Sequence, residues 1–391
     1  MSRPDVARRT QLSKPTVNEV VDELLAAAYL NESPEDGDTR PRRPGPRARL
    51  LTFNASLGHV LGIDIGAIKI VVLVADLSGN ILAVNRRRTS NRARSDPEAL
   101  LQEVRATARA ALRSCSLSVS SLVAVGVGTP GVINPASGAV TLAPQLGGWE
   151  GIHLGSLLSP SFPCPVLVEN EVRLSVLAER WRGAAKGVEN ALYIQIGVGI
   201  GAGILIDGEI YRGATGAAGE IGYLPLVEGN EQDGNGFGPY EYAAGGVAFA
   251  RLGQRIASTP RGAFLRMLAG RDPEGVDAEV VFEAARHGDV AAVEIVNTLV
   301  ERIARGIASA VVILNPEVVI VGGGVSRAGM TLMTPLERCV RDLVPLPVRL
   351  VLSTLGEESV ALGAVHHALQ STEDRLFAFE TDDGQSKASA L

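Results

Sequence analysis

The residues with the most evident chemistry in this 391-residue sequence form a glycine-dense segment, Gln195 to Tyr223. Nine of the residues from Gly197 to Gly222 are glycine. Because glycine has no side chain, the backbone N–H groups of such a segment can approach a phosphate or a sugar without obstruction. The segment therefore predicts a pocket that binds a phosphorylated or polyhydroxylated small molecule.

The N-terminus carries a second kind of chemistry, because its pattern is typical of a DNA-reading helix-turn-helix. A short helix is expected from Ser2 to about Arg9, with a proline in its first turn, where the missing N–H costs little. Ser13 then caps a second helix. Its apolar residues form one stripe that we expect to be buried: Val17, Val20, Val21, Leu24 and Leu25. The side chains expected to reach a major groove are Ser13, Lys14, Thr16 and Asn18.

A turn-rich segment rich in proline and arginine follows Leu30, between two short β-like pieces. It includes Arg40, Arg42 and Arg43, and no acid lies from residue 39 to residue 49. This pattern fits the wing of a winged helix, whose arginines contact phosphates or a minor groove; a flexible basic linker is the alternative. We assign residues 1–55 to this domain. Its usual first helix is missing, so either the natural start lies upstream of Met1 or the domain lacks that helix.

Charge confines nucleic-acid contact to the N-terminal region. The formal net charge is −6; residues 1–50 carry nine Lys+Arg and eight Asp+Glu, whereas the remainder carries 28 and 35. The N-terminus has no apolar signal segment, and the longest apolar run, residues 191–206, is interrupted by glycines and too short to span a bilayer. We expect a cytoplasmic protein that does not associate with membranes.

Strand-like and helix-like segments alternate after residue 55, which predicts an α/β fold with ligands at the strand ends. Strands are expected around a glycine turn after His59, at 122–128 and at 317–321, and helices at 97–114 and 171–182. We divide this part into a first lobe (56–170), a second lobe (171–356) and a closing helix that packs back on the first lobe (357–370). A disordered tail (371–391) is expected to follow.

Several motifs in a fixed order resemble the ROK family, which comprises repressors, open reading frames of unassigned role, and sugar kinases. The motifs are LGIDIGAIKI (61–70), GVGTPGVINPASG (126–138), VENEVRLSVLAE (168–179), GAAGEIG (216–222) and EVVIVGGGVS (317–326). The resemblance implies the actin-like ATPase fold of two lobes. The preceding residues resemble the winged helix-turn-helix of ROK repressors.

In ROK kinases an Asp-x-Gly-Gly-Thr-Lys-like loop handles ATP phosphate and magnesium. This sequence retains Asp64, Gly66 and Lys69 but has Ala67 and Ile68 in place of the second glycine and the threonine. Isoleucine cannot hydrogen-bond a phosphate oxygen, so the loop either binds nucleotide in vestigial form or merely packs. The remaining nucleotide positions that the resemblance implies are Gly199, Gly201, Gly322, Gly323 and Gly324. Strand-then-glycine patterns alone are weak evidence, and Val198 replaces a further threonine.

The resemblance places the general base for sugar phosphorylation at Glu171, where kinases usually have aspartate. A carboxylate is retained, but the longer side chain moves its oxygens by about an ångström, and a misplacement of that order can cost roughly 100-fold in rate. Asn170 and Glu171 are also expected to contact sugar; the alternative is that they only cap the following helix. Arg173 stands where the family usually has a small or amide-bearing residue.

Three further positions are implied to contact sugar hydroxyls: Gln145, Glu220 and Glu241. For Glu220 the alternative is an exposed structural carboxylate. The zinc-binding His and Cys of many relatives are replaced, since Tyr223 occupies the histidine position and the cysteine positions are Gln232, Gly234 and Pro239. We therefore expect no structural zinc and no other metal site.

Three functions are compatible with these residues. The first is a sugar-responsive transcriptional regulator, a repressor, that binds operator DNA as a homodimer or homotetramer and requires no cofactor. The second is an active ATP-dependent hexose kinase, which would use MgATP. The third is a sugar-binding protein that neither phosphorylates nor binds DNA. The lost hydroxyls at residues 68 and 198, beside retained carboxylates on the sugar side, favour the first.

Overall fold

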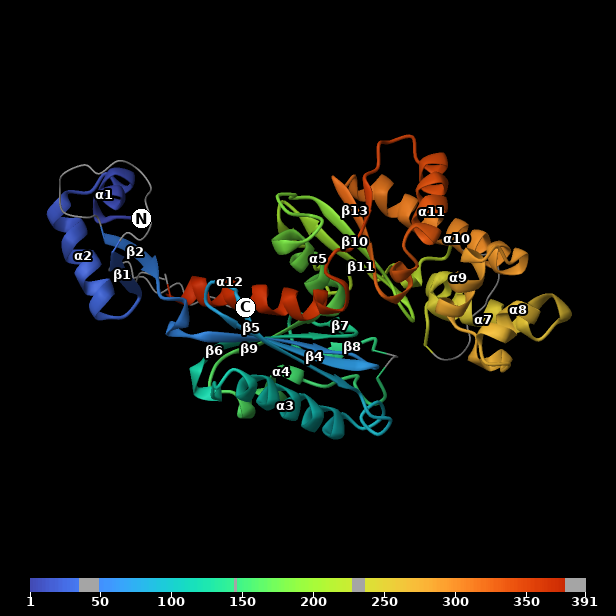
Figure 1. Cartoon of the computed structure of the whole chain (residues 1–391), viewed down its shortest axis with the longest axis horizontal. Coiled ribbons are helices and arrows are strands. Elements are labelled where there is room, and N and C mark those ends of the chain that lie inside the picture. The colour runs from blue at the N-terminus through green and yellow to red at the C-terminus, as the bar shows by residue number, and fades with distance from the viewer. Residues whose placement is uncertain (35–48, 144–145, 227–235, 377–391) are drawn as a thin grey trace.

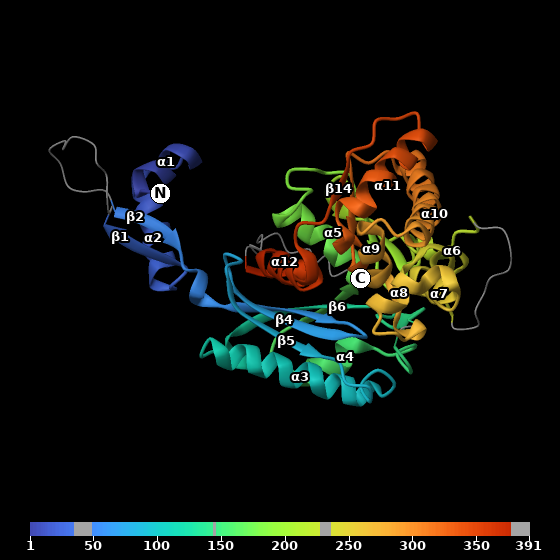
Figure 2. The same cartoon turned by 45° about the vertical axis from the view of Figure 1, so that its right-hand side comes forward.

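The computed structural model describes residues 1–34, 49–143, 146–226 and 236–376 of the chain. They form a small N-terminal head and two lobes, each built on a five-stranded sheet. Figure 1 shows the head at one end of the molecule. The lobes meet where helices α5 (Glu171–Arg182) and α12 (Ser359–Leu376) pack together. The turned view in Figure 2 shows the head projecting from the first lobe only.

The head contains the two predicted helices, α1 (Arg3–Thr10) and α2 (Lys14–Ala26). The predicted cap is confirmed, since the Ser13 side chain accepts a hydrogen bond from the Thr16 N–H. The predicted buried stripe is wrong in part: Val17 and Val21 are buried, but the side chain of Val20 is 45% exposed. The small core of the head reaches only one side of α2, so the stripe is narrower than its sequence pattern.

Strands β1 (Leu30–Pro34) and β2 (Arg49–Phe53) pair antiparallel, as the sequence predicts for the segments that flank the wing; the residues between them lie outside the described part. A short segment then leads to the first lobe. The Asn54 N–H donates to the Tyr29 carbonyl and its side-chain amide donates to the Ala28 carbonyl. The next carbonyl, that of Ala55, accepts from the Leu77 N–H of the first lobe.

The sheet of the first lobe has the order β5-β4-β3-β6-β9. Strands β3, β6 and β9 are parallel to one another, and β3-β4-β5 is an antiparallel meander. Alternate residues of β3 and β4 face opposite sides, so both faces of the sheet are apolar. The elements are β3 (His59–Ile65), β4 (Lys69–Asp76), β5 (Ile81–Arg88), α3 (Pro97–Ser114), β6 (Leu122–Thr129), β7 (Val132–Ile133), β8 (Val140–Thr141), α4 (Leu154–Leu158) and β9 (Val166–Asn170).

Helices α3 and α4 cover one face of this sheet, and the C-terminal helix α12 covers the other (Figure 1). The close fit of α12 depends on glycine. A Cβ placed on Gly126 would lie 2.0 Å from the Ala364 carbonyl oxygen, and one on Gly62 would lie 2.1 Å from that of Ala361. The closing helix is longer than predicted: α12 continues to Leu376, so residues 371–376 are helical, and 377–391 lie outside the described part.

The second lobe has the mixed sheet β12-β11-β10-β13-β14. One face packs on α5, and the other is covered by a group of helices. Its strands are β10 (Ala191–Ile196), β11 (Ile200–Ile206), β12 (Glu209–Ile210), β13 (Val318–Gly322) and β14 (Leu350–Leu352). Its helices are α6 (Pro239–Ala244), α7 (Gly246–Ala257), α8 (Ala263–Leu268), α9 (Ala278–Arg286), α10 (Val290–Leu314) and α11 (Met330–Leu343).

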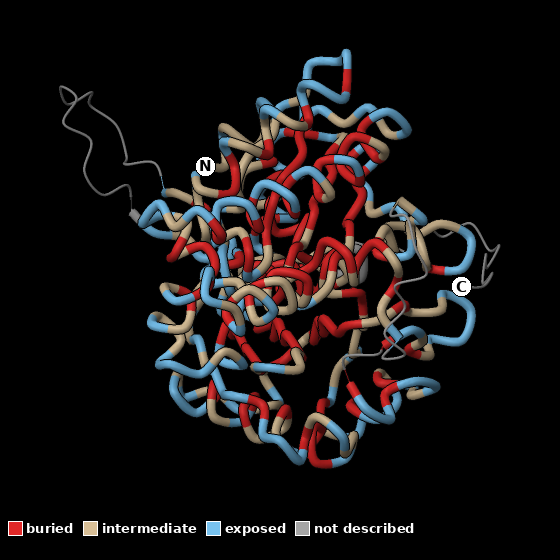
Figure 3. The backbone as a smooth tube through the Cα atoms, turned by 90° about the vertical axis from the view of Figure 1, so that its right-hand side faces the viewer, coloured by how far each residue is buried: buried red, intermediate tan, exposed pale blue. Residues whose placement is uncertain are grey.

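Figure 3 shows buried residues concentrated in the interior of the molecule, and β3 and β4 are buried along almost their whole length. None of the helices in the described part of the chain has the length and apolarity that crossing a bilayer requires. The fold is mixed α/β with both sheets covered on both faces. Its polar functional groups are therefore found where strands end, not on the sheet faces.

Candidate functional site at the junction of the lobes

The carboxyl ends of three neighbouring strands of the first sheet bring candidate residues together. In the sheet register, Asp64 of β3 lies opposite Gly128 of β6, and Thr129 lies opposite Asn170 of β9. In the second sheet, Gln195 of β10 lies opposite Gly322 of β13. We call the group formed by Asp64, Lys69, Glu171, Gln195 and Glu220 the junction site.

Glu171 connects helix α5 to the second sheet within the junction site. It is the first residue of α5, and its Oε1 accepts a hydrogen bond of 2.8 Å from the Gln195 Nε2 of the second sheet. Burial raises the pKa of Glu171 to about 7, and the nearby Glu220 carboxylate adds to the shift, whereas the bond from Gln195 and the charge of Lys69 oppose it. A carboxyl group with this pKa can exchange a proton near neutral pH.

Asp64 is the second buried carboxyl group of the junction site. Burial raises the pKa of Asp64 to about 8, and the Glu171 carboxylate raises it further, whereas Lys69 lowers it. A folded-state pKa above that of the unfolded chain means that the native protein binds the proton more tightly. The stability that this group contributes is therefore present at acidic pH and is lost as the pH rises toward 8.

We expect Asp64→Asn to remove this pH dependence. The difference in Tm, variant minus unsubstituted protein, should be more positive at pH 8 than at pH 5. The change in this difference should be equivalent to about 1 kcal/mol or more. Thermal unfolding at pH 5, 6, 7 and 8 measures the difference. Asp342→Asn, on the exposed side of α11, is the control and should give a difference independent of pH. A pH-independent difference for Asp64→Asn would contradict the burial of a titrating carboxyl group here.

The Asn170 side chain caps α5, as one of the two readings of the sequence predicts. Its Oδ1 accepts from the N–H groups of Val172 (2.9 Å) and Arg173 (3.2 Å), and its Nδ2 donates to the Gly131 carbonyl at 2.9 Å. Since Nδ2 has a second hydrogen, a sugar contact at Asn170 remains a prediction compatible with capping.

The nucleotide side of the junction site does not fit a polyphosphate. The Ile68 side chain is 57% exposed at the loop where a phosphate-binding hydroxyl is expected, and that of Val198 is 47% exposed. The Lys69 Nζ is already 3.1 Å from a carboxylate oxygen of Glu357, which also pairs with Arg327. An acid of this chain therefore holds the cation that would attract a phosphate.

Four of the glycines predicted to bind nucleotide are required by packing or by backbone conformation. A Cβ on Gly199 would lie 1.5 Å from Glu241 Oε1, and one on Gly322 would lie 1.9 Å from the Tyr193 hydroxyl. Gly66 closes a turn by donating to the Lys69 carbonyl, and Gly323 has a φ of +85°. The two remaining glycines differ, since a Cβ on Gly201 would meet Val172 of α5 at 3.2 Å, whereas one on Gly324 would meet no atom within 4 Å.

Glu241 lies in α6 and is buried, where it holds the glycine-rich segment. Its two oxygens accept from the N–H groups of Ile200 and Gly238, each at 3.3 Å. Burial raises the pKa of Tyr223, the residue in the usual histidine position, and the charges of Glu241 and Glu220 raise it further. Glu241 thus adjoins the junction site.

Sequence reasoning missed two contributors. Gln195 appears only as one polar residue in an otherwise apolar strand, and its contact with Glu171 joins that strand to α5. Arg173 was singled out as unusual, but its partners were not foreseen: it is buried and pairs with Glu169 at 3.0 Å. Its charge lowers the pKa of Glu220, opposing the larger upward effect of burial.

The remaining predicted residues are away from the junction site or outside the described part. Ser13, Lys14, Thr16 and Asn18 are exposed on the head, at the N-terminal end of α2. Gln145, Arg40, Arg42, Arg43, Gln232 and Gly234 lie outside the described residues. Within residues 1–34, 49–143, 146–226 and 236–376, no cluster of His, Cys, Asp and Glu is arranged to hold a metal ion.

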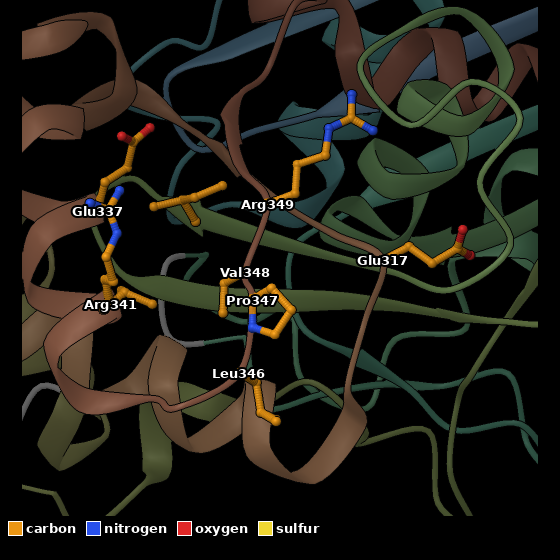
Figure 4. Close-up of a pocket in the computed structure, with 9 residues that line it drawn as sticks. Glu317, Glu337, Arg341, Leu346, Pro347, Val348 and Arg349 are labelled. Carbon is orange, nitrogen blue, oxygen red and sulfur yellow. The ribbon is translucent and has the colours of Figure 1, made fainter.

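A cavity of about 630 Å³ lies elsewhere, on the second lobe between α11 and the segment that leads into β14 (Figure 4). Its lining combines aliphatic side chains with two acids and two arginines: Glu317, Glu337, Val340, Arg341, Leu346, Pro347, Val348, Arg349 and Leu350. None of the predicted site residues lines it. The candidate site is therefore identified by its buried carboxyl groups and strand ends, not by cavity size.

Comparison with known proteins identifies relatives of both kinds that the sequence suggests. A family model described as ROK family matches residues 60–371. The xylose repressor of Caldicellulosiruptor bescii is 28% identical over 93% of this chain and 90% of its own. The glucokinase of Thermotoga maritima is 34% identical over 61% of this chain and 77% of its own. A ROK family transcriptional regulator, a homologue of the Escherichia coli MLC protein, has a similar fold, with a TM-score of 0.73 at 23% identity over 94% of this chain and 92% of that one.

Proposed function

Because the chain belongs to the ROK family, we propose that it is a sugar-responsive, DNA-binding transcriptional regulator whose degenerate sugar-kinase domain acts as the sensor. It is a repressor that binds operator DNA as a homodimer or homotetramer in the cytoplasm. A sugar or sugar phosphate binds at the junction site and at Gln145, Asn170 and Glu241. The ligand needs only to prefer one arrangement of the lobes, so catalysis is unnecessary.

The observation that carries this proposal is the contrast between the two sides of the junction site. On the sugar side, carboxyl groups are retained and positioned by backbone and side-chain hydrogen bonds. On the nucleotide side, Ile68 and Val198 expose apolar side chains, and Lys69 is paired with Glu357. Such a site favours binding a sugar without transferring a phosphate to it. The repressor relative, which spans both head and lobes, supports the same function.

An active ATP-dependent hexose kinase is the second candidate, and one observation favours it. The pKa of Glu171, about 7, suits a group that takes a proton from a sugar hydroxyl. In that case Glu171 is the base and MgATP the cofactor. The residues present do not fit the nucleotide well, so we propose no required cofactor and no structural zinc.

Ligand binding tests the proposal. We expect D-xylose, D-glucose, N-acetyl-D-glucosamine or the 6-phosphate of either hexose to raise the Tm, because a ligand that binds only the native state stabilises it. MgATP should add nothing, and a coupled ADP-release assay with the same sugars should show no turnover. No shift with any of these compounds would contradict the sensor. Sustained ADP release would instead establish the kinase.

DNA binding distinguishes a regulator from a protein that only binds sugar. We expect a gel shift with DNA from upstream of the protein's own gene, and we expect Lys14→Ala combined with Asn18→Ala to abolish it. Both side chains are exposed at the start of α2, so the substitutions should leave the Tm within about 1 °C of the original. Absence of binding by the unsubstituted protein would favour the sugar-binding protein without a DNA role.

A further inference from the structure

Arg173 is a cation buried at the junction of the lobes. It lies in the first turn of α5 and is 1% exposed. Its Nη1 is 3.0 Å from Glu169 Oε1 in β9 of the first lobe. Its Nη2 donates to the backbone carbonyls of Gly216 and, at 3.3 Å, Ala218. One side chain therefore connects β9 with the segment that precedes Glu220.

A second arginine connects the other end of this segment to the same acid. The Arg212 Nε lies 2.7 Å from Glu169 Oε2, while Glu169 Oε1 also accepts from the Asn170 N–H at 2.8 Å. The Glu169 carboxyl group is itself buried. We call the segment 212–219 the tethered loop. Its first residue, Arg212, binds the Glu169 carboxylate directly, and its other end is held to the same carboxylate through Arg173.

The tethered loop has little room to move. Gly216 has a φ of +80°, and a Cβ there would lie 2.2 Å from the Ile133 carbonyl oxygen of β7. Gly219 has a φ of +95°, and a Cβ there would lie 2.0 Å from the Ala202 carbonyl oxygen of β11. The loop therefore fits between a strand of the first lobe and a strand of the second, immediately before Glu220.

We propose that Arg173 is a positioning residue that ties the tethered loop to the first lobe and so fixes the place and the charge of Glu220 for sugar binding. The part of this inference that concerns sugar rests on the proposed function. A buried ion pair is weak evidence for stability, because desolvation offsets much of the attraction. The guanidinium of Arg173 contacts two carbonyls and one carboxylate, and its planar shape fixes the positions of these groups relative to one another.

The electrostatic surroundings of Glu220 give the arginine a second effect. Among the residues that the structure describes, the charged and titratable groups that interact with Glu220 are Arg173 and Glu171 of α5 and Tyr223 of its own segment. Arg173 is the cation among them, and it lowers the pKa of Glu220 against the upward effect of burial. Removing it should leave Glu220 protonated to a higher pH. A protonated carboxyl group is a poorer acceptor for sugar hydroxyls.

The tether is tested without any ligand by hydrogen–deuterium exchange. Removing Arg173 alone would leave the buried negative charge of Glu169 with one cationic partner fewer. The main variant is therefore Arg173→Gln combined with Glu169→Gln, which removes both charges of the pair. We expect exchange in 212–219 to become at least about 10-fold faster, because the loop loses its anchors. Arg182→Gln, at the other end of α5, is the control and should leave this exchange unchanged. Unchanged exchange in the double variant would overturn the tether.

Sugar affinity as a function of pH separates position from charge. The probe is whichever of D-xylose, D-glucose and N-acetyl-D-glucosamine gives the original protein the largest Tm shift. We expect the double variant to bind it roughly 10-fold more weakly at pH 7. We also expect the acidic limit, the pH below which protonation weakens sugar binding, to move to higher pH. Arg173→Lys should loosen the loop but keep the original acidic limit, because it retains the charge. An unmoved acidic limit in the double variant would overturn the electrostatic part.

These outcomes remain distinct from failure of the proposed function. If the original protein binds none of the three sugars, the sensor is contradicted, while the exchange experiment still decides whether Arg173 anchors the loop. If sugar binds and the exchange does not change, the tether is contradicted and the sensor is retained.

Discussion

Gly126→Ala is expected to lower the Tm by at least about 6 °C, an effect equivalent to roughly 3 kcal/mol. A Cβ at this position would lie 2.0 Å from the Ala364 carbonyl oxygen, which belongs to the backbone of α12. A backbone atom in a helix cannot rotate away as a flexible side chain can. The helix must therefore move off the first sheet, and its apolar contacts with β3 and β6 are weakened along its length.

Gly155→Ala is the matched control for this substitution. Gly155 lies in α4, and its nearest neighbours would be 3.7 Å from the added Cβ, an ordinary contact distance. Alanine favours the helix, so the Tm should stay the same or rise slightly. Thermal unfolding of both purified variants makes the comparison. If Gly126→Ala melts within about 1 °C of the original protein, the close seating of α12 is contradicted.

Glu220→Ala is expected to weaken sugar binding by at least about 100-fold, because hydrogen bonds from hydroxyls to a charged acceptor are among the stronger ones. Glu220 is partly buried and interacts with Arg173 and Glu171, so water replaces its contacts poorly. Titration with the sugar that stabilises the original protein most measures the change. Since the head is untouched, DNA binding in the absence of sugar should persist.

The control for this prediction is Glu209→Ala. Glu209 is exposed in β12 of the same lobe, so its removal changes the charge equally without touching the junction site. Sugar affinity should remain within about twofold of the original. Equal affinities for Glu220→Ala and the original protein would remove Glu220 from the sugar site and leave it a structural carboxylate.

Elements whose signals are local could be predicted from the sequence. Helix α3 begins and ends as expected, at Pro97 and Ser114, since the Asp96 side chain accepts from the N–H groups of Glu98 and Ala99 and proline follows the cap. Helix α5 likewise occupies the predicted 171–182, after its Asn170 cap. The alternation of strands and helices was sufficient for the α/β class, and the ordered motifs for the family.

Contacts that depend on distant segments could not be predicted. The Lys69–Glu357 pair joins residues 288 positions apart, and the hydrogen bond between Glu171 and Gln195 joins a helix to a strand 24 positions further along the chain. Nothing in the local pattern around Arg173 indicates that its partners are the carbonyls of residues 216 and 218. For Val20 the local pattern predicted burial that the structure does not show, because a helical stripe is buried only where another element covers it.

The segment between the head and the first lobe has a mechanical consequence. Asn54 is hydrogen-bonded back to Ala28 and Tyr29 of the head, and the adjacent Ala55 is bonded to Leu77 of the first lobe. Hydrogen bonds on both sides of this connection restrict the directions in which the head can turn relative to the first lobe. The head projects from the first lobe, so a rotation of that lobe by a few degrees would displace α2 and its exposed residues further than it displaces the connection.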